Sequence, residues 1–403
     1  MNGTKAAYIV DAVRTPIGRF GGALSTIRPD DMLAHVIKAL IERNPGIDLN
    51  EIEEVIAGAA NQAGEDNRNV ARMAALLAGL PESVAGVTVN RLCASGLQAI
   101  IDSSRAIRLD EGNIYIAGGE ESMTRGPMVM SKAERAYRRP AELHDSTFGW
   151  RFINPKLSAL YPPIGMGETA ENLAEKYNVS REAQDQFAYD TQMKYKAAHE
   201  AGKFADELIA VPIPQRKKDP IIFDTDEHPR PESTLEGLAK LRTVFKKDGT
   251  VTAGNASGIN DGAAAVIVCD ESTLKKYNLT PMARIVSHAV AGVNPLIMGI
   301  GPVPATQKAL KRAGLKMSDI GLVELNEAFA AQSIPCMQDL DLDPAIVNPN
   351  GGAIALGHPL GCSGTRIMTT LLHEMKRRSD VKYGLATMCV GVGQGAAVIV
   401  ERV

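Results

Sequence analysis

Aromatic residues are scarce in this sequence, where they account for 4% of the 403 residues. Few aromatic side chains leave few platforms on which nucleic-acid bases can stack. The formal net charge of −3 also provides no basic surface for a phosphate backbone, so we expect no nucleic-acid partner. No apolar run approaches the roughly 18–20 residues that a membrane-spanning helix needs, so we expect no membrane partner either.

Cysteine is also scarce, and the five cysteines show no CxxC spacing. An odd number of scattered thiols argues against a disulfide framework and against a metal site. The opening stretch, MNGTKAAYIVDAVRTPIG, is typical of a strand and a turn rather than of a signal peptide. We therefore expect a cytoplasmic protein without a bound metal. The five cysteines are Cys93, Cys269, Cys336, Cys362 and Cys389.

Strand-like and helix-like segments alternate at both ends of the sequence, whose length suits two or three domains. Near the N-terminus, strand-like runs at 6–13, 53–60, 84–90 and 113–119 alternate with helical patterns at 32–44, 69–80 and 95–109. The last third repeats this scheme from MARIVSHAVAG (282–292) onward. Such alternation predicts parallel sheets that are covered by helices.

Two distant segments are similar to each other. VNRLCASGLQAIIDSSRAIR and LGHPLGCSGTRIMTTLLHEMKRR both lead through small residues, with a Ser-Gly pair, into a helix. We interpret them as the products of an internal duplication. Between them, the region 121–250 is rich in proline and charge and has one clear helical pattern, at 181–202. This region predicts a largely irregular insertion that folds onto the core.

Cys93 lies at an abrupt change of pattern in VTVNRLCASG (87–96), where a β-branched run gives way to small residues and a helix. The partial positive charge of a helix start favours a thiolate, and small neighbours leave room for a substrate carbonyl. A buried packing cysteine explains the same residues. Cys93 by itself therefore leaves both interpretations open.

Two further segments favour the catalytic interpretation. NPNGGAIALGHPLGCSGTR (348–366) places His358 in a glycine-rich turn before a helix, where a neutral imidazole suits the role of base to a thiol. A surface or capping histidine is the alternative. TMCVGVGQG (387–395) places Cys389 at a strand end, and the N–H groups that follow suit a developing oxyanion. Its GxGxG pattern is a weak dinucleotide signal, because no helix and further strand follow it.

Taken together, these blocks resemble the thiolase family. LCASG around Cys93, NEAFAAQ at 326–332, NPNGGAIALGHPLGCSGTR and CVGVGQG match the family's signature blocks in order and spacing. AGNASGINDGAAA (253–265) matches another block, and the similarity covers essentially the whole chain. The resemblance implies an α/β, thiolase-like fold: a duplicated five-layer αβαβα core with a loop-domain insertion. It also implies a homodimer or a homotetramer.

The implied domains are an N-terminal core (1–120 plus 251–272), a loop domain that covers the coenzyme A (CoA) site (121–250) and a C-terminal core (273–403). The implied reaction is CoA-dependent cleavage of a 3-oxoacyl-CoA, which is reversible as a Claisen condensation. Acyl-CoA and CoA are then substrates, and no tightly bound cofactor is needed.

The resemblance also implies a role for each residue of the site. Cys93 is the nucleophile and Cys389 the acid and base, while the backbone N–H groups of Cys93 and Gly391 hold an oxyanion. His358, with a water fixed by Asn326, holds the enolate oxygen. The remaining cysteines are expected to be packing residues, and Glu327 is expected to orient its neighbours.

The CoA contacts follow from the family positions alone. Arg230 is implied near the adenine end of CoA. The residues implied along the pantetheine tunnel are Ser257, Ala253, Gly254, Met166, Ala328 and Phe329.

Departures from the family pattern bear on the substrate. Many biosynthetic members have a histidine where this chain has Gly165 and a glycine where it has Val392. AGEDNRNVARMAALLAGLP and DEHPRPESTLEGLAKL resemble the 3-oxoadipyl-CoA thiolases of aromatic degradation. We therefore favour a degradative thiolase for 3-oxoadipyl-CoA or another 3-oxoacyl-CoA, and a short-chain acetoacetyl-CoA thiolase stays open. A ketosynthase-type condensing enzyme and a non-catalytic lipid-binding scaffold are weaker alternatives, because Cys389 and the other reactive positions are present.

Overall fold

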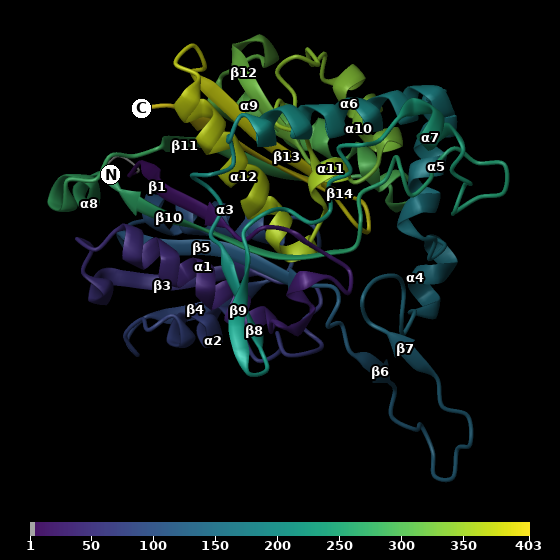
Figure 1. The fold of residues 1–403 in the computed structure, drawn as a ribbon, viewed down its shortest axis with the longest axis horizontal. Helices are drawn as coiled ribbons and strands as arrows, with labels where there is room; N and C mark the ends of the chain where they lie inside the picture. The colour runs from purple at the N-terminus through teal and green to yellow at the C-terminus, as the bar shows by residue number, and fades with distance from the viewer. Residues whose placement is uncertain (1–4) are drawn as a thin grey trace.

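The computed structural model describes residues 5–403. Its main feature is a mixed sheet of ten strands with helices on both sides (Figure 1). Only two residue pairs, Tyr8 with Arg284 and Ile9 with Ala283, join β1 (Ala7–Arg14) to β11 (Ala283–Gly292). The sheet therefore divides at this junction into an N-terminal half and a C-terminal half.

The N-terminal half has the strand order β1–β10–β5–β3–β4. Strands β3, β4 and β5 pair in parallel, whereas β10 is antiparallel to both β1 and β5. Helices α1 and α2 pack their apolar faces on the outer side of this half. The bounds are β2 (Gly18–Arg19), α1 (Pro29–Arg43), β3 (Ile52–Gly58), α2 (Val70–Leu77), β4 (Ala85–Val89), β5 (Ile114–Ser122) and β10 (Asn260–Asp270).

The C-terminal half has the order β11–β14–β13–β12. Strand β14 is antiparallel to both of its neighbours, and β12 pairs in parallel with β13. Helices α9 and α10 cover the outer face. The bounds are α9 (Pro302–Ala313), β12 (Ile320–Leu325), α10 (Ala330–Asp339), β13 (Tyr383–Val390) and β14 (Gln394–Glu401).

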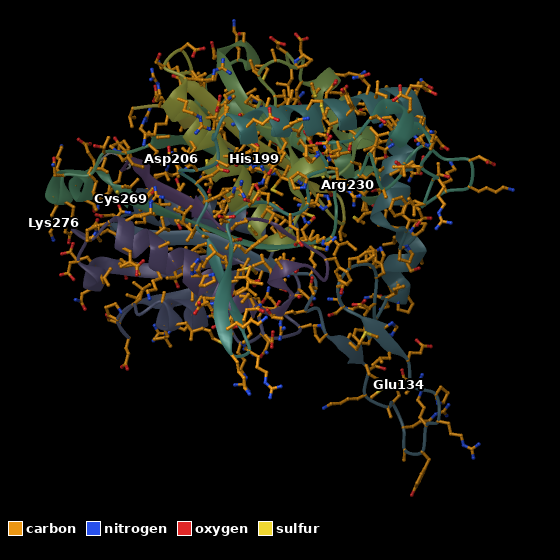
Figure 2. All side chains as sticks on the ribbon, in the orientation of Figure 1. Glu134, His199, Asp206, Arg230, Cys269 and Lys276 are labelled. Carbon is orange, nitrogen blue, oxygen red and sulfur yellow. The ribbon has the colours of Figure 1, made fainter. Side chains whose placement is uncertain are left out.

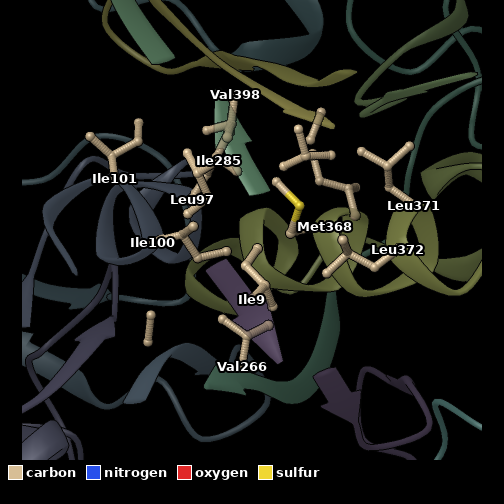
Figure 3. Packing of buried hydrophobic residues seen from close by; sticks show 14 of the residues in the cluster. Ile9, Leu97, Ile100, Ile101, Val266, Ile285, Met368, Leu371, Leu372 and Val398 are labelled. Carbon is tan, nitrogen blue, oxygen red and sulfur yellow. The ribbon is translucent and has the colours of Figure 1, made fainter. Parts of the chain in front are cut away.

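Two helices, α3 (Ser95–Arg108) and α12 (Leu360–Arg377), form a layer between the two halves. Figure 3 shows Leu97 and Met368 of these helices packed between Ile9 of the first half and Val398 of the second. Residues 361–375 of α12 are all buried, as a helix between two sheets requires. The layers are thus helix, sheet, helix, sheet and helix, which confirms the predicted fold class.

The insertion is more regular than the sequence suggested. The predicted helix at 181–202 is confirmed as α6 (Arg181–Glu200), but α5 (Met166–Tyr177) was not predicted. Its start is fixed by a hydrogen bond of 2.6 Å from Gly165 N to Glu168 Oε2. In the sequence, a glutamate at this position is only a weak sign of a helix start, because prolines precede it. The other bounds are β6 (Met128–Met130), β7 (Leu143–Asp145), α4 (Pro155–Leu160), β8 (Val211–Gln215), β9 (Lys218–Phe223) and α7 (Leu235–Ala239).

The chain around β6 and β7 projects from the body as an arm (Figure 1), and Glu134 lies on its outer part (Figure 2). Two shorter helices, α8 (Glu271–Tyr277) and α11 (Ala353–Leu356), complete the α-helices of residues 5–403. Within that range, no helix has both the length and the apolar character that crossing a membrane demands.

Candidate active site

The N-terminal turns of α3 and α12 touch backbone to backbone. A Cβ atom on Gly96 would lie 2.7 Å from Gly361 O, and one on Gly364 would lie 2.2 Å from Leu97 N. Both distances are far below van der Waals contact, so only glycine permits this approach. Because Cys93 precedes α3 and His358 precedes α12, the close packing brings these two turns together.

The turn that carries Cys93 is held tightly. Leu92 has a φ of 47°, a left-handed conformation that costs a side-chain-bearing residue about 1–2 kcal/mol. Asn90 Oδ1 compensates by accepting a hydrogen bond of 2.9 Å from Leu92 N, and Ser95 Oγ donates one of 2.6 Å to Leu92 O. Cys93 is half-buried, whereas the other four cysteines are fully buried. The strained turn thus presents the one thiol that is partly open.

Two backbone N–H groups lie near the sulfur of Cys93. Those of Gly391 and of Cys93 itself are close enough to act against the rise in the pKa of this thiol. Gly391 follows β13, and the next residue, Val392, has a φ of 61° that turns the chain into β14. A β-branched residue in that region is strained, as is often seen at functional sites.

Burial acts against a thiolate at Cys93, in the opposite direction to the expected effect of the start of α3. Burial raises the pKa of Cys93 to about 11, although the nearby N–H groups of Gly391 and Cys93 act in the opposite direction. The negative charge of Glu121 raises this pKa further. Desolvation therefore outweighs the two N–H groups and favours the neutral thiol of Cys93 in the free protein.

His358 is a buried, neutral imidazole with a defined tautomer. Burial, with the charge of Arg366, lowers its pKa to about 3. Its Nδ1 lies 2.6 Å from Ser363 Oγ, which in turn lies 2.6 Å from Pro359 O. The carbonyl oxygen only accepts, so the single hydroxyl proton points to Pro359 and Nδ1–H donates to Ser363 Oγ. The Nε2 atom of a neutral ring then carries the lone pair.

Asn326 lies directly after β12, and its N–H donates to Thr387 O of the neighbouring β13 at 3.0 Å. Its side-chain Nδ2 is 3.5 Å from both ring nitrogens of His358, too long and too symmetric for a directed hydrogen bond. Its Oδ1 is buried and has no hydrogen-bond partner among residues 5–403. Such a buried, unpaired polar atom suits a water or a ligand group as partner.

Glu327 holds three segments together beneath this site. Its carboxylate accepts hydrogen bonds from Thr191 of α6 at 3.0 Å, from Asn348 at 2.7 Å and from Ile354 N at 3.2 Å. Burial raises its pKa, and these hydrogen bonds act in the opposite direction. Three donors from separate segments thus hold the carboxylate in place, in line with a residue that orients its neighbours.

Cys389 is the second thiol of the site. It is 1% exposed and packs in an apolar cluster with Met166, Ala328 and Phe329. Burial raises its pKa well above the ordinary value, and so does charge on the nearby Cys93. Cys389 is therefore a neutral thiol, able to give up a proton but reluctant to hold a charge.

Some of the residues implied in CoA binding lie beside Cys389, since Met166, Ala328 and Phe329 pack with it in one cluster. The segment 253–257 runs beside the chain after β12, with hydrogen bonds of 2.9 Å from Ser257 N to Ala328 O and from Ala330 N to Asn255 O. Arg230 is exposed, and its backbone N–H donates to Gln192 Oε1 at 2.9 Å. Figure 2 shows Arg230 well away from Cys269, which is buried in the outer core of the first half.

Three other cysteines pack in cores. Cys269, Cys336 and Cys362 are fully buried, and the Cys336 thiol donates to Gly299 O at 3.2 Å.

Ser363 is the residue of the site that sequence reasoning missed, because a serine in the first turn of a helix is typical of capping. Its position five residues after His358 in LGHPLGCSG was the available signal. Among residues 5–403, no group of three or more His, Cys, Asp or Glu side chains has a geometry suited to a metal ion.

Fold and site together define a class: an acyltransferase that has two related α/β halves and two neighbouring free cysteines. The thiolase N-terminal domain family matches residues 7–272, and the thiolase C-terminal domain family matches residues 279–402. The chain belongs to the thiolase family.

Relatives match over the full length. A protein of Acinetobacter baylyi named beta-ketoadipyl-CoA thiolase is 56% identical over 401 residues, which cover 99% of this chain and 100% of that protein. The crystal structure of the Bacillus anthracis acetyl-CoA acetyltransferase has a TM-score of 0.94 at 42% identity, with 100% of each chain covered. That of human mitochondrial 3-ketoacyl-CoA thiolase in complex with CoA has a TM-score of 0.91 at 43% identity and covers 99% of this chain and 98% of that chain.

Proposed function

We propose that this thiolase cleaves 3-oxoadipyl-CoA with CoA, giving acetyl-CoA and a shortened acyl-CoA through an acyl-Cys93 intermediate. The name of the Acinetobacter baylyi relative supports this substrate. The observation that supports the chemistry is the position of Cys93: the N–H groups of Gly391 and Cys93 lie near its sulfur, and its charge is close enough to raise the pKa of the Cys389 thiol. A nucleophile, an oxyanion site and an acid are then near one another.

The first step forms a bond from Cys93 Sγ to the ketone carbon, C3, of the substrate. With pKa values of about 11 and about 3, Cys93 and His358 form no ion pair at rest. The proton therefore passes from sulfur to His358 Nε2 as the sulfur attacks. The negative charge moves at once to the C3 oxygen, where the N–H groups of Cys93 and Gly391 hold it. Each such donor is worth roughly 3–4 kcal/mol in comparable sites.

Collapse of this intermediate breaks the C2–C3 bond and leaves the acyl group on Cys93. The leaving enolate of acetyl-CoA needs its oxygen stabilised, and His358 Nε2–H, with a water at Asn326, provides this. Cys389 then gives its proton to C2 of the enolate. Its high pKa in the free site makes the resulting thiolate a strong base for the next proton transfer.

The second half-reaction regenerates the enzyme. The Cys389 thiolate takes the proton of incoming CoA, and the CoA thiolate attacks the acyl carbon on Cys93. The same two N–H groups hold the new oxyanion. Collapse returns the acyl group to CoA, and Cys93 recovers its proton from His358. Atoms and protons balance over the cycle, and the same steps in reverse condense two acyl-CoA molecules.

The CoA substrate is proposed to lie along the apolar cluster of Cys389, with Met166, Ala328, Phe329 and the segment 253–257 around the pantetheine arm and Arg230 near the adenine end. We further propose a cytoplasmic homodimer or homotetramer without a tightly bound cofactor. The three-domain division given above also remains a proposal.

A cleavage assay tests the substrate. Purified protein and CoA are mixed with 3-oxoadipyl-, 3-oxohexanoyl- or acetoacetyl-CoA, and loss of the thioester–enolate absorbance is followed. We expect the highest kcat/KM with 3-oxoadipyl-CoA. The highest value with acetoacetyl-CoA would instead assign a short-chain thiolase.

Variants test the residue roles in the same assay. Cys93→Ala should abolish turnover, and Cys389→Ala should slow it by several orders of magnitude while acylation of Cys93 remains measurable. Cys336→Ser is the matched control, because it alters a buried thiol near Cys389 that no step uses. Full activity in either of the first two variants would contradict the assignment.

A further inference from the structure

A small apolar cavity lies beside the oxyanion donors. Its walls include Trp150, Leu157 and Met166 of the insertion, and Val392, the residue after Gly391. Met166 Sδ would lie 3.8 Å from a Cβ atom on Gly391, so this wall approaches the residue whose N–H group lies near Cys93 Sγ. An acyl chain attached to Cys93 therefore has an apolar wall within reach for its methylene groups.

The insertion residues around this cavity form a largely exposed apolar stretch that contains one half-buried cation, Arg151. Within the described residues, its one side-chain hydrogen bond goes from Nη2 to Asn61 Oδ1 at a long 3.5 Å. It forms no ion pair within 4.0 Å with any carboxylate of residues 5–403, whereas the similarly buried Arg181 pairs with Asp185 at 2.7 Å. The exposed Asp145 lies farther off, and hydrogen bonds with Thr147, together with the charge of Arg151, lower its pKa. A half-buried guanidinium without a close ion pair has N–H donors available for a ligand carboxylate.

The contacts of Arg151 place it on the side of the insertion that faces the loop after β3, near the turn before Cys93. Asn61 follows β3, and its side-chain Nδ2 also donates to Ser146 O at 3.0 Å, which ties the insertion to this loop. The carbonyl of the preceding Ala60 accepts a hydrogen bond of 2.9 Å from Asn90, the residue that fixes the turn before Cys93. Arg151 thus faces the loop that borders the Cys93 turn, and Trp150, next to it in the sequence, lines the apolar cavity.

We propose that Arg151 binds the terminal carboxylate of the acyl group, so that the enzyme selects dicarboxylic 3-oxoacyl-CoA substrates. This inference rests on the proposed function. In 3-oxoadipyl-CoA, the carboxylate carbon lies three bonds beyond the ketone carbon, a span of about 4 Å. Two methylene groups then lie against the apolar wall, and the guanidinium forms a bidentate ion pair with the carboxylate. The long bond to Asn61 leaves Arg151 free to change partner.

The test compares 3-oxoadipyl-CoA with 3-oxohexanoyl-CoA, which has the same length but ends in a methyl group. We expect Arg151→Gln to lower the ratio of the two kcat/KM values, adipyl over hexanoyl, by about 10–100-fold. Arg151→Lys should keep part of the preference, because lysine retains the positive charge but cannot donate two parallel hydrogen bonds to the carboxylate. Lys156→Gln is the matched control, since it removes an exposed cation from the same stretch, and it should leave the ratio unchanged.

The outcomes separate two failures. A wild-type enzyme that cleaves 3-oxohexanoyl-CoA but not 3-oxoadipyl-CoA would overturn the proposed substrate. A wild-type preference for 3-oxoadipyl-CoA that persists in Arg151→Gln, or an equal loss with both substrates, would overturn the role of Arg151 alone. Higher ionic strength should weaken the wild-type preference and leave Arg151→Gln unaffected, which gives a second readout that a purely structural role would not produce.

Discussion

Replacement of Ser363 by alanine tests how the site keeps His358 ready to accept a proton. Ser363 Oγ donates to Pro359 O and accepts from His358 Nδ1, each at 2.6 Å. With Nδ1 committed as a donor, the lone pair of the neutral ring is at Nε2. We expect Ser363→Ala to slow the acylation of Cys93, because nothing then holds the ring in this tautomer.

The size of the effect follows from the burial of the ring. His358 is 5% exposed, so an Nδ1–H without a partner gains little from water. A buried polar group left unsatisfied costs about 1–3 kcal/mol. The ring escapes this cost only by moving its proton to Nε2, which removes the lone pair that the reaction needs. If the whole penalty enters the barrier to acylation, the rate falls by about 5–150-fold.

Single-turnover kinetics measure this rate, and nitrogen NMR of the labelled imidazole reports the tautomer. Ser103→Ala is the matched control: Ser103 is also fully buried in the central layer, and its Oγ donates to Ala99 O, four residues earlier, at 3.0 Å. Both variants lose a helix back-bond, but only Ser363→Ala affects His358. Wild-type acylation in Ser363→Ala, or an equal loss in both variants, would refute the reasoning.

Two further predictions use the same contacts. Because burial raises the pKa of Cys93 to about 11, its alkylation by iodoacetamide should accelerate about tenfold per pH unit from pH 7 to 10. A rate that levels off above about pH 9, as expected for a free cysteine with a pKa of about 8.5, would contradict this. Gly361→Ala should lower the unfolding free energy by about 1–3 kcal/mol, because its Cβ would lie 2.2 Å from Glu120 O. Gly46→Ala, with nothing within 4 Å, should change it little, and equal denaturant midpoints for the two variants would refute the packing argument.

Local patterns were sufficient for most of the regular elements. The predicted strand at 6–13 is β1 (Ala7–Arg14), and the predicted helix at 95–109 is α3 (Ser95–Arg108). The position of α12 was beyond local reasoning. Its sequence contains Arg, His and Glu, yet it is buried on all sides, because Arg366 meets the equally buried Glu324 at 3.4 Å and His373 meets Ala12 O at 2.9 Å. Such partners come from distant segments and leave no trace in the periodicity.

The candidate site shows a similar division. The small residues around Cys93 and Cys389 were visible in the sequence, but their convergence was implied only by resemblance to a family. The effect of burial on the pKa of Cys93 could not be predicted, because a helix start is visible locally whereas desolvation depends on the whole fold. Ser363 and Arg151 were missed for a related reason: each looks ordinary in sequence, and only its spatial neighbours reveal a role.

The free site carries no charge on either thiol or on the imidazole, and this bears on how it works. A preformed thiolate–imidazolium pair would sit in a buried pocket, where the cost of desolvating both charges offsets much of their attraction. Here the cost is postponed until a carbonyl oxygen is present to receive the charge, beside N–H groups whose positions are already fixed by the strained turns at Leu92 and Val392. Because the charge appears only with substrate, the transition state gains stabilisation that the resting enzyme lacks, and such a difference accelerates the chemical step.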